Sequence, residues 1–242
     1  MTPGSAIPLD NAISAPDIVG FSPAGRSAVI VSNRLAMLQV FTGLNGVPRL
    51  AMQTGISGLG EIGTAAVSDD GTLTVALTAD GRVYLLSPSQ TPQTIFQTGS
   101  PAGITFLQNQ PAVAIADGGA ATVSVIDGLN GVPFTRVTIP GPKLSGDAVL
   151  VQTSLDGQSL FVAAHGGTSA HRIDLVNRTM QSIEAPARFS ELERLPGGDV
   201  FLFSANPGEA AWLLMSDGAN LSAGFAQSTG GRDLRDLKRV RP

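Results

Sequence analysis

Two identical hexapeptides strongly limit what this chain of 242 residues can fold into. Gly-Leu-Asn-Gly-Val-Pro stands at Gly43–Pro48 and again at Gly128–Pro133, 85 residues further on. Each copy lies between two predicted strands, so each is interpreted as a turn. The second copy separates Thr122–Ile126 from Phe134–Ile139, where apolar and polar residues alternate. The repetition indicates internal duplication, with another unit between the two copies.

The rest of the chain follows the same plan of four strand signals in each unit. The five predicted units span residues 18–54, 62–98, 101–139, 145–184 and 187–226. Their third strands are centred at steps of 45, 40, 47 and 42 residues, on Phe41, Leu86, Ile126, Ile173 and Met215. Four strands in about 40 to 45 residues are typical of a β-propeller blade. Because a single four-stranded sheet cannot cover both of its apolar faces, each blade requires a neighbour. The sequence predicts one all-β domain, a β-propeller.

The two ends of the chain leave the closure of the ring open. Ile7–Leu9 is interpreted as a fourth strand that precedes the first full blade. In the segment 227–242, the apolar residues Leu234, Leu237 and Val240 fit either a first strand or one face of a short helix. No segment supplies the remaining strands of a sixth blade. We therefore expect five full repeats, with either a closed ring or an incomplete sixth blade.

The composition agrees with many short strands and excludes several classes of protein. Hydrophobic residues make up 43% of the chain and charged residues 14%, with 29 Gly and 16 Pro for tight turns. The net charge of -4, with scattered basic residues, argues against nucleic-acid binding. The absence of Cys excludes disulfides and thiolate chemistry. No apolar run approaches the roughly 20 residues of a membrane span, and Met1–Pro16 does not resemble a signal peptide.

Two segments resemble the YVTN-type β-propeller repeats of bacterial proteins. They are Ala121–Asp127, with the sequence Ala-Thr-Val-Ser-Val-Ile-Asp, and Ser154–Ala164, which begins with the turn Ser-Leu-Asp-Gly. The resemblance covers residues 18 to 226 and implies a propeller fold. It leaves the activity open, because the superfamily contains surface-layer proteins, lactonase-like enzymes and binding modules. Gln108–Pro111 and Pro196–Gly198 depart from the usual Ser-Pro-Asp-Gly turn, so we expect these two turns to be built differently.

A polar residue recurs after the second strand of each unit and forms the candidate ligand site. The five residues are Asn33, Asp80, Asp117, His165 and Asn206. In a propeller these hairpins share one end with the connectors between blades, so the five side chains are expected to form a ring at the channel mouth. The alternative is turn chemistry alone, because Asn and Asp favour tight turns by bonding their own backbone.

Catalytic and metal-binding motifs are weak by comparison. His165 and His171 could meet in one hairpin near Asp174, but a metal centre requires further converging ligands. No Gly-x-Ser-x-Gly nucleophile elbow occurs. Asp69–Gly71 resembles part of a calcium loop without its spaced acidic ligands, so it is interpreted as a turn. We predict no catalytic residue, no metal and no cofactor.

These observations favour a noncatalytic binding or scaffold propeller, whose partner is a protein or a small polar ligand. An extracytoplasmic location, periplasmic or secreted, is expected. The alternative function is a lactonase-like or other hydrolytic propeller, with its site at the channel mouth. In that case Glu61, Asp147 and Glu191 would supply acidic groups beside the ring of polar residues.

Overall fold

The computed structural model describes residues 9–88, 90–131, 133–195, 198–204, 211–218 and 220–226. These residues contain twenty strands in five four-stranded antiparallel sheets, and no helix. Blade 1 consists of β1 (Ile18–Phe21), β2 (Ser27–Ser32), β3 (Met37–Thr42) and β4 (Arg49–Gly55). Blade 2 consists of β5 (Ile62–Val67), β6 (Thr74–Thr78), β7 (Arg82–Leu86) and β8 (Gln93–Gln97).

The remaining three blades repeat this order. Blade 3 consists of β9 (Ala102–Phe106), β10 (Val113–Asp117), β11 (Thr122–Asp127) and β12 (Thr135–Pro140). Blade 4 consists of β13 (Val149–Thr153), β14 (Ser159–Ala164), β15 (Ser169–Asp174) and β16 (Thr179–Glu184). Blade 5 consists of β17 (Glu193–Arg194), β18 (Val200–Ser204), β19 (Ala211–Ser216) and β20 (Leu221–Ala226). The predicted all-β propeller of four-stranded blades is therefore confirmed, and each predicted third-strand residue lies in a third strand.

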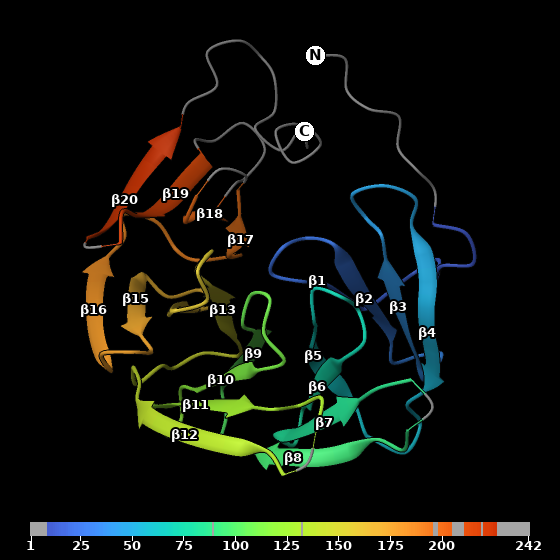
Figure 1. The fold of residues 1–242 in the computed structure, drawn as a ribbon. Coiled ribbons are helices and arrows are strands. Elements are labelled where there is room, and N and C mark those ends of the chain that lie inside the picture. The colour runs from blue at the N-terminus through green and yellow to red at the C-terminus, as the bar shows by residue number, and fades with distance from the viewer. Residues whose placement is uncertain are drawn as a thin grey trace.

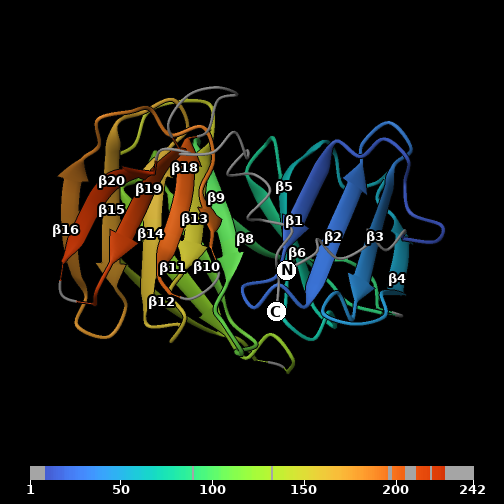
Figure 2. The ribbon, with the colours of Figure 1, turned by 90° about the horizontal axis from the view of Figure 1, so that it is seen from above.

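Within each blade the strands pair in sequence order, and the five blades follow one another around an arc (Figure 1). The first strands β1, β5, β9 and β13 form the inner row, where neighbouring blades contact each other. Blade 4 also contacts blade 5 through β16 and β20. The view from above shows blades 1 and 5 with their strands running between two ends of the molecule (Figure 2). These two ends carry different sets of loops.

The core lies between the blades. Four clusters of buried apolar residues occupy the four interfaces from blades 1 and 2 to blades 4 and 5. Strand β10 shows the principle, because Val113 and Ile115 pack against blade 2 while Ala114 and Ala116 pack against blade 4. Successive side chains of a strand point to opposite faces, so a central strand buried on both faces has an unbroken apolar sequence. Each blade is thus stabilised by its neighbours, as the repeat predicts.

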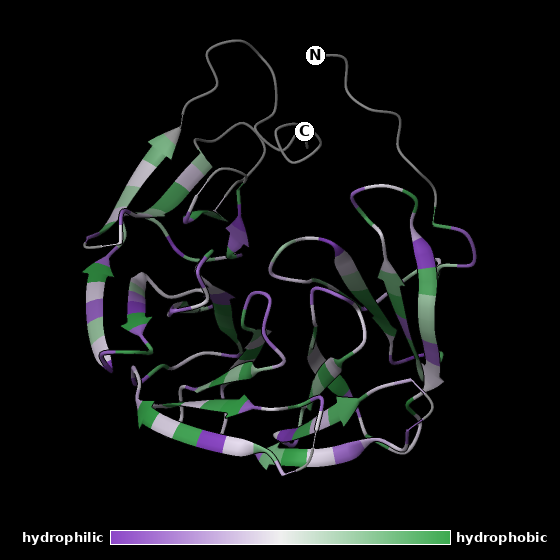
Figure 3. Cartoon of the chain, in the orientation of Figure 1, coloured by the Kyte–Doolittle hydropathy of each residue, from purple (hydrophilic) through white to green (hydrophobic). Residues whose placement is uncertain are grey.

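The outer strands differ from the inner ones in hydropathy. Figure 3 shows hydrophobic residues interspersed with hydrophilic ones along β8, β12 and β16 at the rim. In β12 only Ile139 is buried, and the other five residues are exposed. This mixed composition agrees with the position of the fourth strands at the rim, where much of each strand is exposed to solvent.

The first strand of blade 5 is much shorter than the sequence predicts. Phe189–Leu195 was expected to form the first strand, but β17 covers Glu193–Arg194 alone. The ring of Phe189 is buried and stacks on Phe203, with a centroid distance of 4.3 Å. The backbone N–H groups of Ser190 and Glu191 both donate to the carbonyl oxygen of Phe203, which cannot occur in a regular ladder. Aromatic packing therefore replaces strand pairing in this segment.

The predictions for the chain ends fall mostly outside the described residues. Ile7, Pro8 and the whole segment 227–242, with Leu234, Leu237 and Val240, lie there. Leu9 is described and belongs to no strand. No strand of a sixth blade occurs in the described part of the chain.

Candidate functional site

The antiparallel order of each blade distributes the loops between two ends of the propeller. We call the end with the turns between strands 1 and 2 and between strands 3 and 4 the turn end. The opposite end carries the hairpins between strands 2 and 3 and the connectors between blades, and we call it the hairpin end. The predicted ring of polar residues belongs to the hairpin end, because each member follows a second strand.

The 1–2 turns of blades 2 and 4 share one construction. The hydroxyl of Ser68 accepts a hydrogen bond from the N–H of Leu73 at 3.0 Å and donates one to Asp70 at 2.6 Å. Ser154 makes the equivalent bonds to Ser159 and Asp156 in blade 4. Each turn closes on a Gly with positive φ, at +72° in Gly71 and +69° in Gly157. The Ser-x-Asp-Gly pattern is therefore a turn in which the side chains cap the backbone.

The 1–2 turn of blade 3 is built differently, as its sequence predicts. Here Asn109 adopts a φ of +55°, whereas in blades 1, 2 and 4 the last residue of the turn, a Gly, has positive φ. Asn tolerates this left-handed conformation better than most residues. The corresponding turn of blade 5 contains Pro196 and Gly197, which lie outside the described residues.

Asp69 connects the turns of three blades. Its carboxylate accepts the N–H of Ala24 from blade 1 at 2.6 Å and the N–H of Asn109 from blade 3 at 2.7 Å. The hydroxyl of Ser27 donates to the backbone carbonyl oxygen of Asp69 at 3.0 Å. A charged acceptor makes such backbone bonds stronger than a neutral one. This residue fixes the spacing of the turns around the channel.

Asp70 is held by its own turn. Partial burial opposes ionisation, but hydrogen bonds from Ser68 and Thr72 outweigh this effect and keep the pKa of Asp70 below its ordinary value. The side chain accepts the N–H and the hydroxyl of Thr72 at 3.0 and 2.9 Å. The carboxylate is therefore ionised above mildly acidic pH and is occupied by donors within the turn.

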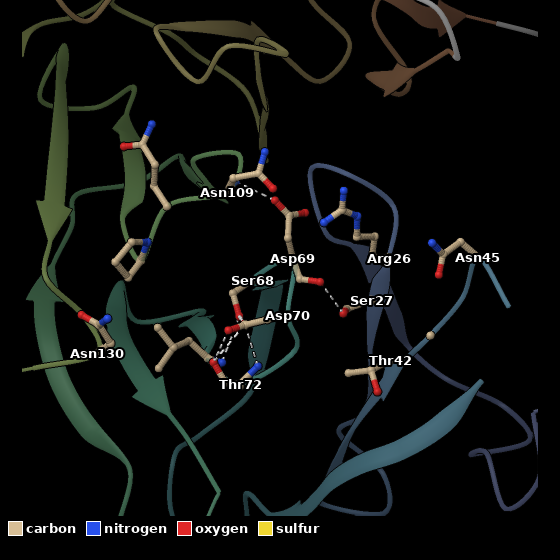
Figure 4. Close-up of a pocket in the computed structure, with 14 residues that line it drawn as sticks. Arg26, Ser27, Thr42, Asn45, Ser68, Asp69, Asp70, Thr72, Asn109 and Asn130 are labelled. Carbon is tan, nitrogen blue, oxygen red and sulfur yellow. Dashed lines mark hydrogen bonds between the residues drawn. The ribbon is translucent and has the colours of Figure 1, made fainter. Parts of the chain in front are cut away.

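A pocket of about 530 Å³ opens beside these turns, between blades 1, 2 and 3. Figure 4 shows Asn45 and Arg26 on one side, Asn109 and Asn130 on the other, and Asp69 and Asp70 between them. Pockets of this size commonly hold small molecules or short peptide segments. Most of the side chains that line it are polar, and none is aromatic.

The repeated hexapeptides form the 3–4 turns of blades 1 and 3 at this pocket. In both copies the first Gly has positive φ, +73° at Gly43 and +76° at Gly128. The N–H of Leu44 donates to the carbonyl oxygen of Arg26 at 3.0 Å, and the N–H of Leu129 donates to that of Pro111 at 2.9 Å. Each hexapeptide thus ties the 3–4 turn to the 1–2 turn of the same blade. The Asn of each copy, Asn45 or Asn130, is exposed and lines the pocket.

Arg194 of β17 reaches the axis of the propeller at the same end. Its Nη1 donates to Gln108 Oε1 of blade 3 at 2.8 Å and to the carbonyl oxygen of Pro23 of blade 1 at 3.4 Å. Nη2 lies 3.9 Å from Asp199, and the guanidinium stacks over Phe201 at 5.5 Å. The side chain is 11% exposed. One residue therefore connects blade 5 to blades 1 and 3.

Three carboxylates act on the buried guanidinium of Arg194. Burial lowers the pKa of its guanidinium, while the carboxylates of Asp199, Asp69 and Asp156 act in the opposite direction. Its Nε and Nη2 are buried without a hydrogen-bond partner among the described residues. A guanidinium remains charged even with a lowered pKa. The acids from blades 2, 4 and 5 thus offset part of the cost of burying this cation.

Four members of the predicted ring are described, and the side chains of two of these bond to the backbone at the entry to a blade. The side-chain amide of Asn33 donates to and accepts from the backbone of Ile62, with both distances 2.9 Å. Asp117 accepts the N–H groups of Gly99 and Ala120. These side chains fix the connectors that lead into blades 2 and 3.

The other two described members are more exposed. Asp80 accepts a hydrogen bond from Thr78 and pairs with Arg82 at 3.1 Å, so its pKa lies below the ordinary value. His165 Nδ1 lies 3.1 Å from Asp147 Oδ1, and this hydrogen bond lowers the pKa of Asp147. No hydrogen bond or ion pair joins any two of the four described members, and Asn206 lies outside the described residues. Whether the ring binds a ligand stays a prediction.

His171 does not join His165 in a metal site. It lies within β15, where Nδ1 is 2.8 Å from Ser182 Oγ, and burial lowers its pKa while Glu184 acts to raise it. Asp174, at the far end of the same strand, accepts hydrogen bonds from Val176 and Asn177. Within the described residues no three His, Cys, Asp or Glu side chains come together as metal ligands.

The sequence interpretation missed the pocket at the turn end. Two signals were present, the Asp69–Gly71 turn and the repeated hexapeptide, but each was interpreted only as local structure. Arg26 and Arg194 belong to no motif. Their positions depend on how turns from different blades meet, which a single sequence does not specify.

Comparison with solved structures supports the fold. The chain is similar to hydrazine synthase of Kuenenia stuttgartiensis, with a TM-score of 0.56 and 15% identity over 92% of this chain and 68% of that chain. It is also similar to the β-propeller domain of Cps50 (Swd1) from Myceliophteria thermophila, with a TM-score of 0.60 and 13% identity. That match covers 89% of this chain and 73% of the other. At these identities the similarity concerns the fold.

No protein-family model matches the chain, and no curated protein sequence matches it. No segment of the described chain forms a helix with the length and apolarity that a bilayer crossing requires.

Proposed function

We propose that this protein is a noncatalytic binding or scaffold β-propeller that takes a protein segment or a small polar ligand in the pocket at its turn end. The observation that carries the proposal is the set of uncommitted polar side chains there. Arg26, Asn45 and Asn130 line the pocket, and none has a side-chain hydrogen bond or ion pair with any residue of the described chain. These three side chains are exposed, so their donors and acceptors are open to a ligand, and all three line one pocket.

The rigidity of the surroundings supports the same proposal. Asp69 joins the turns of blades 1, 2 and 3, and each hexapeptide is bonded to the neighbouring turn of its own blade. A binding site on a rigid frame loses less conformational entropy when a ligand binds. The pocket is thus preorganised by contacts that do not use its free side chains.

The proposal also covers the type of repeat and the location of the protein. We infer that the repeats are of the YVTN type and that the protein works outside the cytoplasm of a bacterium, in the periplasm or after secretion. The Ser-x-Asp-Gly turns of blades 2 and 4 support the repeat type. The predicted ring at the hairpin end is retained as a second location for a ligand.

The alternative is a lactonase-like or other hydrolytic propeller. One observation favours it, the pair of exposed side chains His165 and Asp147 at the hairpin end, 3.1 Å apart. An imidazole oriented by a carboxylate is a recurring acid/base arrangement. Glu61 and Glu191 would be the further acids in this function.

A ligand screen with site variants tests the proposal. Thermal shift and NMR titration of the full chain with amino acids, short peptides, sugars, lactones and divalent metal ions should yield ligands that bind at the turn end. The variant Arg26→Gln with Asn45→Ala and Asn130→Ala should weaken them, whereas His165→Ala with Asp80→Ala should not.

The reverse pattern would move the site to the hairpin end. Lactone hydrolysis that disappears in His165→Ala would replace the binding function by the hydrolytic one. If every ligand bound equally well to both sets of variants, the proposal would be wrong.

A further inference from the structure

The pocket at the turn end contains the one motif whose role the fold alone does not explain, the repeated Asn of the two hexapeptides. Asn45 and Asn130 occupy the same turn position in blades 1 and 3, and blade 2 lies between them. In blade 4 the equivalent leucine, Leu175, makes the same backbone bond to Gln158, at 2.8 Å, but Val176 follows it. The backbone bond therefore does not require Asn at the next position.

The conformation of the two turns does not require Asn either. Asn109 adopts positive φ, a conformation in which Asn is favoured, but Asn45 and Asn130 are not among the residues with positive φ. Their amides make no hydrogen bond with another described residue. Each amide offers two N–H donors and one carbonyl acceptor. The two side chains thus present the same pair of functions from opposite sides of the pocket (Figure 4).

The charged side chains of the pocket differ in whether they already have hydrogen-bond partners within the protein. Asp69 and Asp70 are occupied by donors of the protein, at distances of 2.6 to 3.0 Å. Arg26 is exposed, its guanidinium points toward the centre of the pocket, and its N–H groups have no partner in the described chain. Guanidinium is suited to bidentate binding of a carboxylate. The two fixed carboxylates disfavour a polyanion, and the guanidinium of Arg26, free in the described chain, can take a single carboxylate.

From this geometry we propose that the pocket binds a short extended peptide segment, with its carboxylate on Arg26 and its backbone amides on Asn45 and Asn130. This inference rests on the proposed binding function and names the class of its ligand. Peptide amides need both donors and acceptors, which the two Asn side chains supply. A saccharide fits less well, because the lining has no aromatic ring on which a sugar could stack.

The experiment uses capped tripeptides as probes and side-chain NMR signals as the readout. Acetyl-Ala-Glu-Ala-amide supplies a side-chain carboxylate, acetyl-Ala-Ala-Ala with a free C-terminus supplies a terminal one, and acetyl-Ala-Gln-Ala-amide supplies neither. Sodium glucuronate and sodium acetate represent an acidic sugar and a bare carboxylate. In ¹⁵N-labelled full-length chain, the Nε–H of Arg26 and the amide NH₂ groups of Asn45 and Asn130 are followed during each titration.

At least one carboxylate peptide should shift all three side-chain signals, with a Kd at least about tenfold lower than that of the Gln peptide, which corresponds to roughly 1.4 kcal/mol. Comparing the first two peptides identifies the source of the carboxylate. Arg26→Gln should abolish the preference for carboxylate, and Arg26→Lys should keep part of it. Asn45→Ala and Asn130→Ala should weaken all of the peptides severalfold without changing the preference.

Arg34→Gln is the matched control, because Arg34 is exposed in the hairpin of the same blade at the opposite end. This variant should leave every Kd unchanged. Equal binding of the Glu and Gln peptides, binding of glucuronate or acetate without the peptides, or no binding of any peptide would overturn the ligand class. If other compounds of the ligand screen still bound at these three residues, the proposed function would stand while this inference failed. If nothing bound there, both would fail.

Discussion

The two ends of this propeller use the same residue types for different purposes. At the hairpin end, Asn33 and Asp117 bond to the backbone of the connectors, and Asp80 bonds within its own hairpin. At the turn end, Asp69 and Arg194 connect different blades, while Arg26, Asn45 and Asn130 stay unpaired in the described chain. A recurring polar residue is therefore no sign of a binding site unless its partners are known.

The difference has a geometric cause. A hairpin between strands 2 and 3 lies beside a connector, whose irregular backbone has N–H and C=O groups that need partners. The 1–2 turns lie nearer to the axis, where loops of several blades approach one another, so that one side chain such as Asp69 can bond to the backbone of two other blades. At the hairpin end, polar side chains thus bond to the adjacent connector or within their own hairpin. At the turn end, they join different blades or remain without a partner in the described chain.

Removing Arg194 should have the largest effect. Arg194→Ala would leave Asp199 and its neighbours without their cation and would break the bonds to Gln108 and Pro23. We expect a loss of about 4 kcal/mol in the free energy of unfolding, as for the removal of one partner of a buried ion pair. Urea unfolding followed by circular dichroism measures this quantity.

The control for this substitution is Arg188→Ala. Arg188 is exposed at the hairpin end, where its Nη1 donates to the carbonyl oxygen of Gly166 at 2.8 Å. Its removal should cost about 1 kcal/mol or less. Equal losses for the two variants would contradict the view that contacts across the axis distinguish the ends.

A second pair of variants compares two glycines of similar conformation. Gly71 at the turn end has a φ of +72°, and Gly166 at the hairpin end has a φ of +74°. A Cβ at Gly71 would lie 2.2 Å from Thr42 Cγ2 of blade 1, whereas a Cβ at Gly166 has no neighbour within 4 Å. Gly71→Ala should cost roughly 3 kcal/mol, from backbone strain together with overpacking.

Gly166→Ala should cost only about 1 kcal/mol, because it has the strain without the clash. Thermal unfolding of the two variants measures the difference between them. If Gly166→Ala were as destabilising as Gly71→Ala, the close packing of turns between blades would not be what separates the two ends.

The acid sensitivity of the turn end gives a smaller effect. The pKa of Asp70 is lower in the folded chain than in the unfolded one, so its contribution is present above its ordinary pKa and is lost as the pH falls through the folded value. Asp70→Asn should therefore flatten the decrease of stability below about pH 4. Because the group is largely exposed, its cost at pH 7 should be about 1 kcal/mol or less.

Urea midpoints between pH 2.5 and pH 7 would measure this change. Asp10→Asn is the control, since Asp10 is exposed, and it should leave the acid limb unaltered. An acid limb that is identical in Asp70→Asn and in the unmodified chain would show that the carboxylate is not held by its turn.

The smallest effect is expected for His165→Ala at the hairpin end. Its side chain and that of Asp147 are 44% and 77% exposed, so solvent screens their attraction and the pair should add almost nothing to stability. Thermal unfolding at pH 7 should thus hardly change. A clear drop in the melting temperature would contradict this expectation, and the loss of a bound ligand in the variant would give the hairpin end the functional role.

Much of the fold could be predicted from the sequence, because its signals are local. Alternation along β12, unbroken apolar runs such as Val113–Ala116 and the Ser-x-Asp-Gly turns each depend on residues close together in the chain. All five third strands lie where the repeat predicts. The error in β17 arose from packing instead, since Phe189 and Phe203 stack where a strand ladder was expected.

The candidate site could not be predicted in the same way. The sequence by itself determined that Asn33, Asp80, Asp117 and His165 follow second strands, that Asp69 and Asp70 lie in a turn, and that one hexapeptide occurs twice. Tertiary structure decided the partners of Asn33, Asp117 and Asp69, because those partners come from other segments. It also brought Arg26, Asn45 and Asn130 to one pocket, since turns far apart in the chain become neighbours only when the blades pack around a common axis.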